Sequence, residues 1–114
     1  MTNPDIEAVA EVVEEAHGQF MQRNQKASAS IGIISSKIRA MGIAADAVNI
    51  DDVHSKTRLV LIVLDQDPGK VGMGIGQIES NDYEMITQLP VSELLAKDVL
   101  EVLEARFSLE PASS

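Results

Sequence analysis

Cysteine is absent from this chain of 114 residues, which excludes a disulfide framework, a thiolate metal site and thiol catalysis. Aromatic residues are also scarce and comprise only Phe20, Tyr83 and Phe107. The hydrophobic core must therefore be built from aliphatic residues and methionine, and a chain of this length can bury one such core. We expect a single domain over residues 1–114, with a mobile tail at residues 108–114.

Basic residues are few, and long apolar runs are missing. The chain has 18 Asp and Glu residues against 9 Lys and Arg residues, which gives a net charge of −9. Such a charge repels the phosphates of nucleic acids and attracts a protein partner with a basic surface. The longest apolar run is far shorter than the ~18 residues of a membrane span, and the acidic N-terminal residues do not resemble a secretory signal. We expect a cytoplasmic protein that binds neither nucleic acid nor membrane.

Two helices are predicted in the first third of the chain. The first covers residues 4–24, where apolar residues recur at a spacing of three and four, namely Ile6, Val9, Val13, Ala16 and Phe20. The second runs from about Ser28 to Met41 and ends before Gly42. Because no proline separates the two, one kinked helix over residues 4–41 is an alternative to a helical hairpin. Residues 43–56 have no sustained period, so we interpret them as a connection.

Strand patterns follow in the second half. The segments 57–65 and 70–79 flank a turn that contains Pro68 and Gly69, which predicts a β-hairpin. Residues 83–89 alternate well enough to form a third strand. Ser92 is placed to cap a final helix over residues 93–107. The predicted fold is α+β, with two N-terminal helices, a three-stranded antiparallel sheet and a C-terminal helix.

The run of six branched apolar residues from Leu59 to Leu64 is the strongest feature of the sequence. An alternating strand needs one buried face, but this run is apolar on both faces. In a three-stranded meander it would also be an edge strand, which is an aggregation hazard unless another strand is inserted beside it or a second copy of the chain pairs with it. We therefore expect a homodimer, with Leu59, Leu61 and Val63 as interface residues, although helix 4–24 covering the sheet of its own chain is an alternative.

The glycines Gly72, Gly74 and Gly76 recur with a period of two. Neither their spacing nor their context fits a dinucleotide-binding or phosphate-binding loop. They would leave one face of a strand without side chains, and we favour close packing of the small residues 28–36 against that face. If the face is open instead, it would form a binding site for an extended peptide or a flat ligand, lined by these glycines with His54 and Tyr83.

No residue group indicates a reaction. Asp51, Asp52 and His54 lack a second cluster that would complete a metal site, so we expect no metal or other cofactor. The segment Ser35 to Lys37 lacks any sign of an oxyanion hole, so we assign no catalytic residues. The leading hypothesis is a non-enzymatic, homodimeric adaptor that binds a protein, for example a basic one, through its acidic surface or sheet edge. The alternative is a small-ligand-binding or enzymatic domain with a pocket on the glycine strand.

Overall fold

The computed structural model describes residues 4–24, 29–80 and 82–107. It contains three α-helices, five strands and one short 3₁₀ helix. Their order and bounds are α1 (Pro4–Arg23), β1 (Ala29–Ile33), α2 (Ser35–Ala40), β2 (Ala45–Asp52), β3 (Thr57–Leu64), β4 (Lys70–Gln77), β5 (Tyr83–Pro90), η1 (Val91–Glu93) and α3 (Ala96–Arg106). The predicted α+β class and the helix at residues 4–24 are confirmed.

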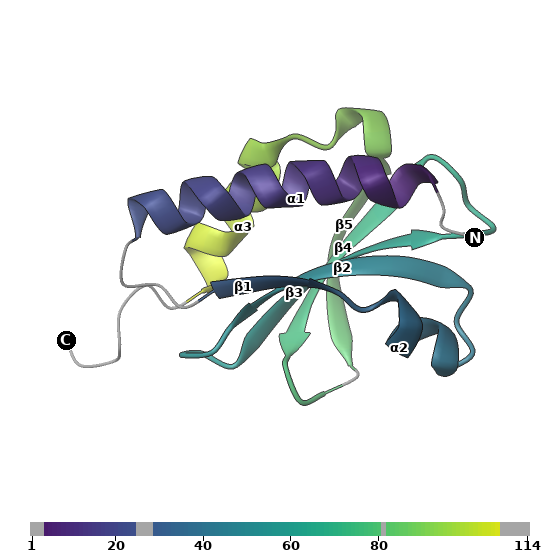
Figure 1. Cartoon of the computed structure of the whole chain (residues 1–114), viewed down its shortest axis with the longest axis horizontal. Helices are drawn as coiled ribbons and strands as arrows, with labels where there is room; N and C mark the ends of the chain where they lie inside the picture. The colour runs from purple at the N-terminus through teal and green to yellow at the C-terminus, as the bar shows by residue number, and fades with distance from the viewer. Residues whose placement is uncertain (1–3, 25–28, 81, 108–114) are drawn as a thin grey trace.

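The five strands form one antiparallel meander in the order β1-β2-β3-β4-β5. Figure 1 shows α1 and α3 on the same side of this sheet, with α2 at the sheet end between β1 and β2. We call the side under α1 and α3 the helix face and the other side the open face. Because consecutive strands pair throughout, β1 and β5 are the two edge strands.

The main hydrophobic core lies between the helix face and the two long helices. Val9, Val13 and Ala16 of α1 are fully buried in it. Phe20 of α1 meets Phe107 edge to face, with ring centroids 6.0 Å apart, so the two phenylalanines join the C-terminal ends of α1 and α3. A smaller cluster lies on the open face, where Ile38 of α2 covers Ala47 and Val60.

The predicted helix at residues 28–41 is wrong. Residues 29–33 form β1, and only Ser35–Ala40 are helical. In this segment Ile31 and Ile33 alternate with Ser30 and Gly32, which is a period of two, and serine and glycine are poor helix formers. Both helical interpretations of residues 4–41, the hairpin and the kinked helix, are therefore wrong.

The predicted connection at residues 43–56 is also wrong, since it contains β2. All residues of β2 except Asp51 are buried, so the strand shows no alternation of apolar and polar residues. The buried residues include three with polar side chains, Asp46, Asn49 and Asp52. Because these interrupt the apolar pattern, the pattern did not predict a strand. With β1 and β2 added, the three-stranded sheet becomes five-stranded, and β3 is central rather than at an edge.

The C-terminal part departs from the prediction in detail. The final helix α3 begins at Ala96, and the carboxylate of Asp98 accepts a hydrogen bond of 3.0 Å from the backbone N–H of Leu95. Asp98 rather than Ser92 therefore satisfies the helix N-terminus. The tail predicted at residues 108–114 lies outside the described residues. No helix in the described ranges is long and apolar enough to cross a membrane.

Candidate functional site

The predicted site residues Gly72, Gly74 and Gly76 lie together on the open face of β4. They accommodate side chains of β5 and not the small residues 29–36, and Ser28 of that prediction lies outside the described residues. A methyl group at Gly72 would lie 2.7 Å from Met85 Cε, and one at Gly76 would lie 2.8 Å from Tyr83 Cδ1. The glycines therefore let Met85 and Tyr83 fold across β4. Tyr83 reaches the smaller cluster around Val60.

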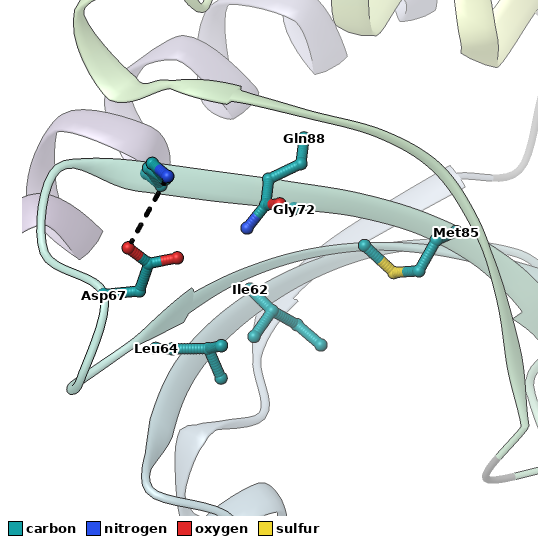
Figure 2. A pocket seen from close by; sticks show the side chains of 7 residues that line it. Ile62, Leu64, Asp67, Gly72, Met85 and Gln88 are labelled. Carbon is teal, nitrogen blue, oxygen red and sulfur yellow. Dashed lines mark ion pairs between the residues drawn. The ribbon is translucent and has the colours of Figure 1, made fainter.

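A shallow groove remains beside Gly72 on the open face, between β3, β4 and β5 (Figure 2). Its apolar walls are Ile62, Leu64 and Met85, and the ion pair between Lys70 and Asp67, 3.9 Å long, lies at its rim. The groove has a volume of about 170 Å³. Pockets for small ligands span roughly 300–1,000 Å³, so this groove has room for a side chain rather than a cofactor.

A polar ladder that the sequence analysis missed crosses the open face. Asp51 of β2 lies opposite Arg58 of β3, and its carboxylate accepts hydrogen bonds of 2.8 and 2.9 Å from Arg58 Nε and Nη2. Asn49 donates a further bond of 2.8 Å to Asp51. Burial alone would raise the pKa of Asp51, but the bonds from Arg58 and Asn49 outweigh it, so this pKa is below its usual value. The ladder is a largely buried ion pair that links β2 to β3.

His54 does not join this ladder, because it lies exposed in the turn between β2 and β3. Its backbone N–H donates a 3.2 Å bond to Asp52 Oδ1, and Ser55 donates a 2.6 Å bond to Asp52 Oδ2. Asp52 therefore stabilises the turn. Among the residues that the structure describes, no group of three or more histidine or acidic side chains is arranged to hold a metal ion.

The predicted interface residues Leu59, Leu61 and Val63 are fully buried in the main core, under the helices of their own chain. The premise that made them interface residues, an edge position for residues 57–65, does not apply because β3 pairs with β2 and β4. The edges of this sheet are elsewhere. Among the described strands, those with an unpaired side, to which a further strand could add, are β1 and β5.

The edge strand β1 has an unpaired outer side. The N–H of Ile34, the residue after β1, donates to Ala47 O at 3.0 Å, which fixes which residues of β1 face β2. Since inward and outward groups alternate in an antiparallel ladder, Gly32 and Ser30 bond to β2 and Ile31 and Ile33 point their N–H and C=O outward. In the described part of the chain, no strand pairs with this outer side.

Between β1 and α1 lies an open groove, which we call the edge groove. It consists of two adjoining hollows of about 330 and 350 Å³ that share Ala10 and Ile33. Glu7 and Glu14 of α1 form one wall, and Ile31 and Ile33 form the other. The side chain of Ile33 is 69% exposed, an unusual value for an isoleucine within a strand.

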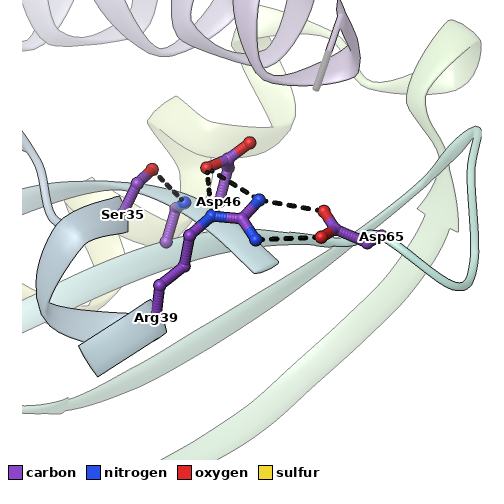
Figure 3. A network of polar contacts seen from close by, with 5 residues as sticks. Ser35, Arg39, Asp46 and Asp65 are labelled. Carbon is purple, nitrogen blue, oxygen red and sulfur yellow. Dashed lines mark hydrogen bonds and ion pairs between the residues drawn. The ribbon is translucent and has the colours of Figure 1, made fainter. Parts of the chain in front are cut away.

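Ser35 of α2 and Asp46 of β2 line one end of the edge groove, and Figure 3 shows the polar contacts that these residues make with Arg39 and their neighbours. Arg39 of α2 donates two bonds of 2.9 Å to Asp65 and one of 3.2 Å to the buried Asp46. The bonds from Arg39 lower the pKa of Asp65, and those to the two carboxylates raise the pKa of Arg39. Ser35 Oγ accepts a 3.1 Å bond from the backbone N–H of Ala47. These contacts attach α2, which has only six residues, to the sheet.

The other sheet edge, β5, is less suited to pairing. Between Met73 and Gly74 the register with β5 shifts, because Met85 and Thr87 face these neighbouring residues and Ile86 is an extra residue. Such a bulge twists an edge strand and interrupts its row of backbone groups, which discourages pairing with another chain. In contrast, β1 pairs with β2 in unbroken register.

Comparison with known proteins yields no matching family model, no similar curated protein and no similar solved structure. The function has to be inferred from the edge groove and the open face themselves.

Proposed function

We propose that this chain is a non-enzymatic protein-binding module whose β1 edge accepts an extended segment of a partner protein as a sixth strand. The observation that carries the proposal is Ile33, which is 69% exposed on an unpaired strand edge beside an open groove. In strand addition, main-chain hydrogen bonds supply affinity, and hollows beside the edge receive alternate side chains of the added segment. The outward backbone groups of Ile31 and Ile33 and the hollows of the edge groove supply both elements.

The alternative, a small-ligand-binding or enzymatic domain with its pocket on the glycine strand, has weaker support. Its groove beside Gly72 holds about 170 Å³ and is open on one side. Among the polar residues that line the edge groove, Ser35 and Asp46 are engaged in holding α2, and Glu7 and Glu14 are exposed carboxylates with no histidine beside them in the described lining. Protein binding at the edge groove therefore has more structural support than ligand binding or catalysis beside Gly72.

The homodimer expected from the sequence stays a prediction. A second copy could add its own β1 in antiparallel orientation and extend the sheet across both chains. Such pairing would bring Glu7 and Glu14 of both copies to one interface, where like charges repel each other. We therefore take the partner to be a different protein.

The proposal is tested by nuclear magnetic resonance with a capped seven-residue probe peptide that alternates threonine and glutamine. We expect chemical-shift changes and slowed amide exchange at Ile31 and Ile33, with none along β5. The control is the same peptide with N-methyl groups on the amides that face β1, which cannot donate to the strand and should leave the spectrum unchanged. Shift changes confined to β5 or to the groove beside Gly72 would refute strand addition at β1.

A further inference from the structure

We propose that the segment bound at the β1 edge is basic, with lysine or arginine at alternate positions that face α1. This inference rests on the proposed function, and it names the chemistry of the partner.

The edge groove is acidic. Its lining contains no lysine or arginine and includes Glu7, Glu14 and Asp46, of which Asp46 is paired with Arg39 outside the lining. Glu7 and Glu14 are both exposed, and neither forms an ion pair with another residue in the described ranges. The whole chain has twice as many acids as bases, so its field also favours a cationic partner.

The spacing of the two glutamates fits an extended segment. Glu7 and Glu14 lie about 10 Å apart along α1, at a rise of 1.5 Å per residue. Side chains on one face of an extended segment recur every ~7 Å. Two cationic side chains on the face toward α1 can therefore each approach one glutamate. An acidic segment would place its charges at the same positions and be repelled.

The wall of the edge groove opposite the acids is apolar. Ile31 and Ile33 line the same hollow as Glu14, and Ile33 also lines the hollow of Glu7. A lysine or arginine has a long apolar stem and a charged head, so its stem can cover the exposed isoleucine while its head reaches the carboxylate. A short polar side chain would not cover the isoleucines, and a purely apolar side chain would not pair with the carboxylates.

The test compares three capped seven-residue peptides that alternate threonine with lysine, glutamine or glutamate. We expect the lysine peptide to bind about fivefold more tightly than the glutamine peptide, and the glutamate peptide more weakly than both. All binding should be mapped by the amides of Ile31 and Ile33. The preference for lysine should decrease as sodium chloride is raised, because the groove acids are exposed to solvent.

Two double variants provide matched controls. Glu7→Gln with Glu14→Gln removes two acids from the edge groove and should abolish the preference for lysine. Glu11→Gln with Glu15→Gln removes two acids from the outer face of the same helix and should preserve most of it. An equal loss in both variants would mean that only the general charge of the chain matters, which would overturn the inference.

The outcomes separate this inference from the proposed function. Equal affinities for the three peptides, with Ile31 and Ile33 still protected, would overturn the basic partner and keep strand addition. Absence of any effect at β1 would overturn both. A chain that light scattering shows to be dimeric, with Ile31 and Ile33 already protected, would identify the second copy as the occupant and also overturn the inference.

Discussion

The imidazole Nε2 of His17 lies 2.8 Å from the carbonyl oxygen of Ala29, so a side chain of α1 holds the first residue of β1. By the alternation of the ladder, this carbonyl points away from β2, as do those of Ile31 and Ile33. His17 thus satisfies one outward group of the edge strand. The same contact fixes the spacing between α1 and β1, the two walls of the edge groove.

Loss of this contact should loosen β1. We predict that His17→Phe, which keeps a planar ring but cannot donate a hydrogen bond, lowers the free energy of unfolding by about 1 kcal/mol. The amides of Ser30 and Gly32 should exchange faster. Urea denaturation and hydrogen exchange measure the two effects. His54→Phe, at an exposed turn position, is the control and should change stability by less than about 0.5 kcal/mol.

The glycines of β4 should differ in their tolerance of alanine. At Gly76 a methyl group would lie 2.5 Å from the carbonyl oxygen of Asp82, a backbone atom that cannot move alone. We predict that Gly76→Ala destabilises the fold by about 2 kcal/mol. At Gly72 the near atom is Met85 Cε, the end of a flexible side chain, so Gly72→Ala should be close to neutral. Thermal unfolding ranks the variants, and a reversed order would contradict the packing described for β4 and β5.

Acid should weaken the link between β2 and β3. Because the folded-state pKa of Asp51 is lowered from its usual 3.8, the carboxylate stabilises the fold above that pH. The stabilisation is lost as the pH falls through the lowered value. We predict that unfolding free energy drops more steeply between about pH 4 and pH 2 in the wild type than in Asp51→Asn, which cannot titrate. Parallel slopes in urea titrations over this range would contradict the assignment.

The attachment of α2 depends on Arg39. We predict that Arg39→Gln, which removes the bonds to Asp65 and Asp46, speeds amide exchange at Ile38 while the amides of β3 stay protected. Lys37→Gln removes a charge from the same helix without breaking these bonds and is the matched control. If both variants exchange alike at Ile38, the Arg39 contacts do not hold the helix.

Sequence reasoning succeeded where periodicity was strong and local. The helix at residues 4–23 and the strands that begin at Thr57, Lys70 and Tyr83 were predicted from apolar spacing and turn residues. It failed for β1, because a strand of five residues is too short for its period of two to be distinguished from a helical pattern. It also failed for β2, because strands buried on both faces do not alternate.

The edge groove could not be predicted from the sequence, because β1 and β2 were not predicted as strands. The edge strands of a sheet can be located only when the full strand order is known. Because β2 was not predicted, the central strand β3 was predicted to be an edge strand. The alternation of Ile31 and Ile33 with Ser30 and Gly32 was the one local signal that could have revealed β1. The pairing of Asp51 with Arg58 depends on the register of β2 with β3, which no local pattern encodes.

Hydrogen exchange of the chain alone tests the central claim, that the outer side of β1 is a free strand edge. We predict an alternating pattern in which the amides of Ile31 and Ile33 exchange rapidly and those of Ser30 and Gly32 are protected by β2. Equal protection of all four amides would contradict the account, since it would mean that the outer side of β1 already has a partner.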